Sequence, residues 1–279
     1  MSPNDRSGEL LLRDGAWSAV SPESAGWRFI SFEVLRLGPG EERSLATGGN
    51  EVCLIPLAGF CRIGAEGAEW ELGRTDVFSG RTSSVYLPRD TELTISSAEG
   101  AEVALCGARC EHRREPVFID ADSVAIEVRG SGNATRQINH VVKPEFPAEH
   151  LLIVEVLTPA GNWSSYPPHK HDEEHGDSEA VLEETYYFRT RSTPPGAFAV
   201  QRLYSPRHGL DLTETIRHGD LLLVPYGYHT TAAAHGHDLY YLNVLAGDRR
   251  TMASADDPDL AWIRPAWTDL EPDPRIPLY

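Results

Sequence analysis

The stretch GNWSSYPPHKHDEEHGDSEAVLEETYYFR (161–189) carries the pattern on which the fold and the site of this chain depend. His169 and His171 are two positions apart, so on an extended strand both imidazoles project from one face. Lys170, between them, projects from the other face. Glu184 opens a strongly apolar run, where a carboxylate is costly unless a positive group meets it. Two imidazoles and a carboxylate on neighbouring strands indicate a metal site.

A third imidazole comes from the later segment GDLLLVPYGYH (219–229). Pro225 and Gly227 end an apolar strand there, and His229 follows at the turn. A later strand can therefore bring a further nitrogen to the same metal ion. The predicted ligands are His169, His171, Glu184 and His229.

Short apolar runs recur along the chain between turn residues, and 24 Gly and 20 Pro cut it into many segments. Runs of this length are typical of strands and are too short for most helices. The chain is therefore predicted to be all-β. The expected strands are 27–37, 51–63, 84–88, 92–97, 150–157, 184–189, 197–204, 220–225 and 239–247.

The two halves of the chain repeat the same order of motifs. Glu51 opens an apolar strand in the first half, as Glu184 does in the second. This similarity predicts a duplicated β module rather than a solenoid of short repeats. We expect a boundary after Cys110, with one domain over residues 1–115 and the other over residues 116–279.

The histidines distinguish the two halves chemically. All 11 lie at or after residue 112. The first half therefore has no imidazole with which to bind a metal ion, and any histidine-based metal chemistry belongs to the second.

The composition argues against several classes of function. Lys+Arg of 25 against Asp+Glu of 42 gives a net charge of −17, whereas nucleic acids and anionic membranes require a dense basic surface. No apolar run reaches the ~18 residues of a membrane span. The polar start MSPNDRSGEL is unlike a signal peptide, so a cytoplasmic protein is expected. The cysteines lack CxxC spacing and are expected to be buried thiols. They are Cys53, Cys61, Cys106 and Cys110.

The ligand pattern resembles the two motifs of the cupin metal site. In the first, a glycine and HxH precede a glutamate-led strand, as Gly161 and the two histidines precede Glu184. In the second, a G-x5-P-x-G turn precedes a histidine, as Gly219 begins the turn before His229. Twelve residues separate His171 from Glu184, where the generic motif has three or four, which predicts an inserted loop. The resemblance implies two tandem cupin (double-stranded β-helix, jelly-roll) barrels.

Several segments are similar to the 5-deoxy-glucuronate isomerases of inositol catabolism, a bicupin family related to the uronate isomerases of pectin breakdown. They are SSYPPHKHD, LEETYYFR, VPYGYH and DLYYLNVLAG, with NEVCLIPLAG and YLP in the first half. Thr230 stands where we expect proline in this family. The family has one metal-binding barrel, which agrees with the distribution of histidines.

This resemblance implies an intramolecular oxidoreductase, that is, a metal-dependent aldose–ketose isomerase. It would interconvert 5-deoxy-D-glucuronate and 5-dehydro-2-deoxy-D-gluconate in myo-inositol catabolism through a metal-stabilised enediolate. The cofactor would be one divalent metal ion (Zn, Mn or Fe), and the partner a uronate-type sugar acid. Duplicated cupins often form homo-oligomers, but the composition fixes no subunit number. Two alternatives stay open: an iron-dependent cupin dioxygenase and a non-catalytic sugar-binding cupin.

Strand parity selects further candidates inside the second barrel. If Glu184 points inward, Tyr186 does so too. In LYYLNVLAG (239–247), a polar pair near the metal favours Tyr241 with Asn243 over the pair one position earlier. The two tyrosines are therefore candidate catalytic residues, and the asparagine is a candidate for binding substrate.

A uronate is an anion, so a chain of this acidity needs a local cation to receive its carboxylate. Arg136, in the segment before the second barrel, is one candidate, and Arg202 is another. For both, the alternative is an ordinary surface arginine.

The acidic insertion 172–183 is predicted to be a solvated loop over the barrel mouth, with a lid as the alternative. His175 within it is expected to face solvent. His235 and His237 form a second HxH, but no glutamate-led strand or PxG turn follows, so a solvated loop is predicted there as well.

Overall fold

The computed structural model describes residues 7–191 and 196–279. Strands dominate this part of the chain, and its helices are single turns. None of these described helices is long and apolar enough to cross a membrane. The prediction of an all-β fold is therefore confirmed, and the architecture is that of two tandem cupin barrels.

Two compact units divide the chain. We call residues 18–125 together with 140–153 the N-terminal barrel, and the remainder, which includes the segment that ends at Trp17, the C-terminal barrel. The predicted domain bounds, 1–115 and 116–279, stay a prediction. In the structure β1 (Leu11–Leu12) pairs with β18 (Leu221–Val224) of the C-terminal barrel. That the barrels are independent domains stays a prediction.

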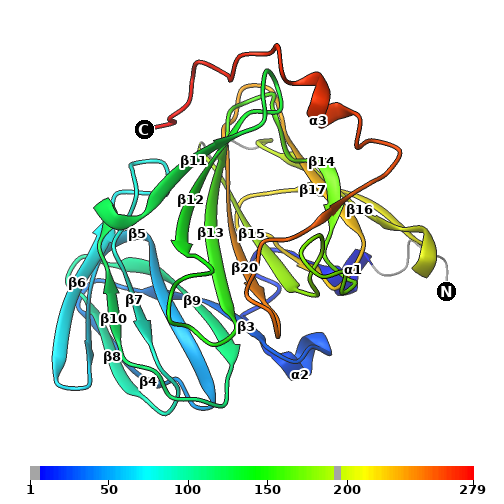
Figure 1. The fold of residues 1–279 in the computed structure, drawn as a ribbon. Helices are drawn as coiled ribbons and strands as arrows, with labels where there is room; N and C mark the ends of the chain where they lie inside the picture. The colour runs from blue at the N-terminus through cyan, green and yellow to red at the C-terminus, as the bar shows by residue number, and fades with distance from the viewer. Residues whose placement is uncertain (1–6, 192–195) are drawn as a thin grey trace. The chain divides into compact units, whose positions relative to one another are not determined.

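In the N-terminal barrel, one nine-stranded sheet surrounds an apolar core. The longest strand of this sheet, β5, bends at a register shift between Pro56 and Ala58. Its first half pairs with β7 and β9, and its second half pairs with β6 and β8. Figure 1 shows these strands in blue to green. The elements are β2 (Ala19–Val20), α2 (Pro22–Ala25), β3 (Ile30–Leu37), β4 (Glu41–Ala46), β5 (Asn50–Ala65), β6 (Ala68–Arg74), β7 (Ser84–Leu87), β8 (Glu92–Ser97), β9 (Ala101–Arg109), β10 (Val117–Ile119) and the 3-10 turn η2 (Ala121–Ser123).

Glu51, the N-terminal counterpart of Glu184 in the sequence, makes hydrogen bonds that stabilise the fold. Its carboxylate is buried and accepts the Tyr86 hydroxyl at 2.7 Å. It also accepts three consecutive backbone N–H groups at 2.7–2.8 Å, those of residues 149–151. These bonds satisfy the buried charge and fasten that segment to β5. The expectation of buried free thiols is confirmed for all four cysteines.

The C-terminal barrel is built from a seven-stranded and a five-stranded sheet. Their orders are β1-β18-β15-β20-β13-β12-β11 and β17-β16-β19-β14-β21. In Figure 1, β15 and β20 run side by side in the first of these. The elements are α1 (Ser7–Leu10), β1, β11 (Ala125–Arg129), β12 (Arg136–Val142), β13 (Leu151–Thr158), β14 (Trp163–Lys170), β15 (Glu183–Thr190), β16 (Ala199–Ser205), the 3-10 turn η3 (Pro206–His208), β17 (Leu210–Ile216), β18, β19 (Tyr228–Ala233), β20 (Leu239–Ala246), β21 (Ala255–Asp256) and α3 (Ile263–Ala266).

Candidate metal centre

Two of the predicted ligands come from neighbouring strands of the five-stranded sheet. His169 on β14 lies directly opposite His229 on β19 in the strand register. Residues opposite each other in an antiparallel pair project from the same face, and their ring centroids are 4.7 Å apart. The register therefore brings together two imidazoles that are far apart in the sequence.

His171 follows directly after β14 and is fixed by a two-way contact with Leu182. The backbone N–H of Leu182 donates to the carbonyl of His171 at 3.0 Å, and the Nδ1 of His171 lies 2.9 Å from the carbonyl of Leu182. Leu182 lies two residues before Glu184, near the start of β15. This contact closes the acidic insertion and places the imidazole beside the carboxylate.

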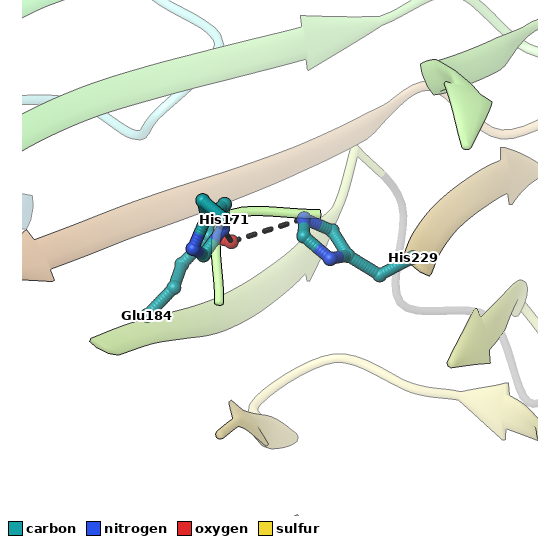
Figure 2. Close-up of side chains that lie close together, drawn as sticks. All are labelled: His171, Glu184 and His229. Atoms are coloured by element: carbon teal, nitrogen blue, oxygen red, sulfur yellow. Dashed lines mark hydrogen bonds and ion pairs between the residues drawn. The ribbon is translucent and has the colours of Figure 1, made fainter. Parts of the chain in front are cut away.

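The carboxylate of Glu184 contacts two imidazoles, and Figure 2 draws its contact with His229 as a dashed line. Its Oε2 lies 2.9 Å from the Nε2 of His171 and 3.1 Å from the Nε2 of His229. The three side chains are buried, and their ligand atoms all lie within 4.8 Å of one another. The ring of His169 borders this group beside His229. The structure thus groups three of the predicted ligands inside the C-terminal barrel, with His169 beside them, and their role as metal ligands stays a prediction.

Backbone carbonyls orient all three imidazoles. The Nδ1 atoms of His169, His171 and His229 lie 3.3, 2.9 and 3.1 Å from the carbonyl oxygens of Pro167, Leu182 and Gly227. Because a carbonyl oxygen can only accept, each Nδ1 carries a proton. Nε2 is therefore the nitrogen that each ring can offer to a metal ion, once it carries no proton of its own.

The donor set fits a divalent metal ion. The Nε2 of His229 is buried and, although near Glu184, has no hydrogen bond among the described residues. A buried nitrogen in that state is costly unless a further group meets it. Three imidazoles and one carboxylate suit Zn²⁺, Mn²⁺ or Fe²⁺, so the residues present can hold the predicted cofactor.

Burial and neighbouring charges prepare these groups for a cation. Burial disfavours the charged form of Glu184, but the hydrogen bond with His171 and the nearby His229 outweigh it and lower the pKa of the carboxyl to about 2. Burial lowers the pKa of His169 well below its usual value, and His229 and His171 lower it further. At neutral pH the cluster therefore offers an ionised carboxylate and a neutral imidazole.

Two tyrosines of the seven-stranded sheet face the same interior. The ring of Tyr186 contacts the ring of His229 edge-on, with centroids 5.7 Å apart. The ring of Tyr186 also contacts that of Tyr241, with centroids 5.0 Å apart. Both tyrosines are buried, and burial raises the pKa of both phenols. Asn243 lies opposite Tyr186 in the register of β15 and β20, so it shares this face, and its amide donates to the carbonyl of Thr185. All three candidates therefore line the barrel near the cluster.

Two serines that the sequence analysis missed connect these tyrosines. The hydroxyl of Ser164 lies 2.6 Å from that of Tyr241, and the hydroxyl of Ser165 lies 3.1 Å from those of both Tyr186 and Tyr241. Strand parity would turn one serine away, but the register shifts after Ser164, and Ser165 has a left-handed backbone at φ 49°. The signal was present in SSYPP, since two prolines interrupt a regular strand.

A second missed pair lies on β16 and β19. Gln201 and Thr231 are buried and face each other on β16 and β19, and the threonine hydroxyl bonds to the glutamine oxygen. The Nε2 of Gln201 has no hydrogen-bond partner among the described residues. The sequence does indicate Gln201, because it is a polar residue between Ala199 and Leu203 on the buried face of an apolar strand.

The two candidate arginines have opposite placements. Arg136 is buried, and its guanidinium donates to the carbonyls of Ala134 and Tyr166 at 3.2 and 3.1 Å. Burial lowers its pKa to about 10, while its proximity to Tyr241 acts in the opposite direction. Arg202 lies on the outer face of β16, is exposed and pairs with Asp211. Only Arg136 therefore lies with the interior polar groups.

The remaining histidines lie outside this cluster. His175 and His235 are exposed, and His237 is half-buried. His175 groups with Glu173 and Glu179, but the ammonium of Lys170 already bonds both carboxylates. The carboxylates of this second acidic group are therefore already paired with a cation of the protein itself.

Two cupin barrels, with His171, Glu184 and His229 grouped inside the second and His169 beside them, define a bicupin protein with a buried candidate metal centre. The chain belongs to the KduI/IolB family, whose model matches residues 9–263. It is 41% identical over 247 residues to the 5-deoxy-glucuronate isomerase of Geobacillus kaustophilus, which covers 88% of this chain and 89% of that protein. The protein of the same name from Bacillus subtilis is 35% identical over 248 residues, covering 88% and 91%.

Two solved structures have a fold similar to that of this chain. The crystal structure of an IolB-like protein from Salmonella typhimurium matches with a TM-score of 0.87 and 35% identity, over 91% of this chain and 99% of that one. An oxalate decarboxylase from Lactobacillus farciminis matches with a TM-score of 0.58 at 13% identity, over 85% and 82% of the two chains. At 13% identity, this second match supports only the fold.

Proposed function

We propose that this protein is a metal-dependent aldose–ketose isomerase that interconverts 5-deoxy-D-glucuronate and 5-dehydro-2-deoxy-D-gluconate in myo-inositol catabolism. Membership of the KduI/IolB family and curated relatives named 5-deoxy-glucuronate isomerase support the substrate class. The observation that carries the chemistry is the convergence of buried imidazoles on Glu184, with ligand atoms within 4.8 Å.

The reaction moves hydrogen within the substrate and needs no external oxidant. A base takes the proton from C2, and the electron pair forms the C1=C2 bond of an enediol as the aldehyde oxygen gains a proton. The C2 hydroxyl then loses its proton to become the ketone, and C1 gains one. The aldehyde is thereby reduced, and the neighbouring alcohol is oxidised.

His169, His171, Glu184 and His229 would hold one divalent ion, Zn²⁺, Mn²⁺ or Fe²⁺. When bound, this ion would supply Lewis-acid stabilisation of negative charge on the substrate oxygens. The backbone carbonyls at Nδ1 keep each Nε2 available for it.

Tyr186 and Tyr241 are the residues we propose for proton transfer at the substrate oxygens. Because burial raises the pKa of both phenols, they stay protonated at neutral pH and act as donors rather than bases. Ser165 bonds both hydroxyls and so connects the two donors. The proton that the C2 hydroxyl releases can return through this chain to the phenol that gave one to the aldehyde oxygen.

The barrel interior also offers groups for the rest of a sugar acid. Arg136 is a buried cation whose two hydrogen bonds go to carbonyls, so it can receive the substrate carboxylate. Asn243 and the free end of the Gln201 amide can bond hydroxyls. Arg202 pairs with Asp211 on the outer face, and we assign it no role with substrate.

The experiment incubates purified protein with 5-deoxy-D-glucuronate, with and without a chelator, and follows ketone formation and oxygen consumption. We expect ketone formation that the chelator abolishes, without oxygen uptake. Metal-dependent oxygen uptake would favour the cupin dioxygenase instead. Binding of the uronate without turnover would favour a sugar-binding cupin.

We also propose a cytoplasmic location, since the four cysteines are free thiols, as is usual in a reducing compartment. Homo-oligomer formation stays a prediction.

A further inference from the structure

The acidic insertion folds around a single ammonium group. The Nζ of Lys170 donates to the carboxylates of Asp172, Glu173 and Glu179 at 2.6, 2.9 and 2.7 Å. Glu179 is buried and also accepts the backbone N–H groups of Asp172 and Glu173, each at 3.0 Å. The expectation of a solvated loop is therefore wrong for this part, because the half-buried ammonium of Lys170 gathers its acidic side chains.

A chain of hydrogen bonds leads from this loop to a predicted metal ligand. The second carboxylate oxygen of Asp172 accepts the backbone N–H of Gly227 at 2.8 Å. The carbonyl of the same glycine lies 3.1 Å from the Nδ1 of His229 and accepts its proton. Gly227 has φ 93°, and a Cβ there would lie 2.7 Å from the carbonyl oxygen of Tyr204, so the turn requires glycine. Asp172 therefore holds the residue that orients the imidazole.

We propose that Asp172 is a positioning residue, which holds His229 in its metal-binding orientation from the acidic insertion. This inference rests on the proposed metal centre. Lys170 lies between His169 and His171 in the sequence and neutralises the carboxylate at its other oxygen. One network thus ties the turn that carries His229 to the strand end that carries the other two imidazoles. Loss of such an outer partner typically weakens metal binding about 10- to 100-fold.

The test compares Asp172→Asn with Asp177→Asn, its matched control. The control removes the same charge from the same loop at an exposed position. The asparagine at 172 cannot both accept from Gly227 and bond the ammonium of Lys170 through an anionic oxygen. The Zn²⁺ affinity of each purified full-length protein is measured by competition with a chromogenic chelator. The visible spectrum of the Co²⁺-loaded proteins reports the ligand geometry. Thermal unfolding of the metal-free proteins checks the fold.

We expect Asp172→Asn to bind Zn²⁺ about 10- to 100-fold more weakly and to change the Co²⁺ spectrum, and Asp177→Asn to match the unmodified protein. Asp172→Glu keeps the charge but moves the oxygens, so an intermediate affinity is expected. Unchanged Zn²⁺ affinity and an unchanged Co²⁺ spectrum in both Asp172 variants would overturn the positioning role alone. Failure of the unmodified protein to bind either ion would overturn the metal centre itself.

Discussion

The Nε2 of His171 and the Oε2 of Glu184 lie 2.9 Å apart, while the Nδ1 of the same ring faces the carbonyl of Leu182 at 2.9 Å. With one proton on the ring, at Nδ1, two lone pairs would face each other across this distance. A second proton on His171 or a metal ion removes that repulsion. Burial lowers the pKa of His171, but its interaction with Glu184 more than compensates, so the pKa is raised.

Metal binding should therefore release a proton. In the metal-free protein the raised pKa keeps His171 protonated to a higher pH than a free imidazole, and a bound ion must displace this proton. His229, His169 and Glu184 are the other titratable groups that face the ring. We expect release of up to one proton from His171 per Zn²⁺ and an affinity that falls as the pH is lowered. Calorimetry in buffers of different ionisation enthalpy measures the release, and pH-independent affinity between pH 5 and 8 would contradict it.

Replacing a ligand should remove the metal without unfolding the barrel. We expect His229→Ala to weaken Zn²⁺ binding by more than about 100-fold, beyond the loss of an outer partner, and to abolish turnover. His235→Ala is the control, because that imidazole is exposed. Metal content and chelator competition are the measurements. Retention of Zn²⁺ at unmodified strength in His229→Ala would exclude this residue as a ligand.

The two phenols should act on turnover more than on binding. Tyr186→Phe and Tyr241→Phe keep the ring packing and remove only the hydroxyl, so we expect kcat to fall about 100-fold or more while bound metal is unchanged. Steady-state kinetics with 5-deoxy-D-glucuronate separates kcat from KM. If each variant lost activity through KM alone, the tyrosines would bind substrate and take no part in proton transfer.

Arg136 should contribute to substrate binding rather than stability. A charged hydrogen bond to a carboxylate is worth about 1.5–3 kcal/mol, so we expect Arg136→Met to raise KM about 10- to 100-fold. The unfolding free energy should change little, because removing a buried charge offsets the loss of its two hydrogen bonds to carbonyls. Arg202→Gln is the control on the outer face. A KM for Arg136→Met equal to that of the control would remove this arginine from the site.

Glu51 should contribute to the stability of the fold but not to metal affinity. Its buried carboxylate accepts four hydrogen bonds, so Glu51→Gln should lower the unfolding free energy by about 3 kcal/mol. Zn²⁺ affinity should be unchanged, in contrast to Glu184→Gln. Denaturant titration and chelator competition measure the two quantities. A weaker metal affinity in the folded Glu51 variant would show that this residue does affect the metal centre.

The apolar strands were predictable, because burial on both faces leaves continuous runs such as the one in β15. The pairing of β1 with β18 was not, since Leu11 and Leu12 form too short a run to indicate a partner about 210 residues away. Parity correctly placed Tyr186 and Tyr241 on the inner face, because the strands that carry them are regular.

Parity failed where the backbone is irregular. The register shift in β14 turns both Ser164 and Ser165 toward the tyrosines, and no periodic pattern predicts it. The acidic insertion was predicted to be a solvated loop because each charged residue, taken alone, is expected to be exposed. Its structure depends on contacts of Glu179 and Asp172 with one lysine, and such contacts arise only from the tertiary fold.

The position of the metal ion tests the proposed metal centre most directly. X-ray diffraction from Zn²⁺-loaded crystals, recorded on both sides of the zinc absorption edge, locates the ion by its anomalous signal. We predict one peak in the C-terminal barrel, about 2.0–2.2 Å from the Nε2 atoms of three histidines and a carboxylate oxygen of Glu184. Those histidines are His169, His171 and His229. A catalytically active protein with no peak there, or with a peak bound by other residues, would contradict this prediction.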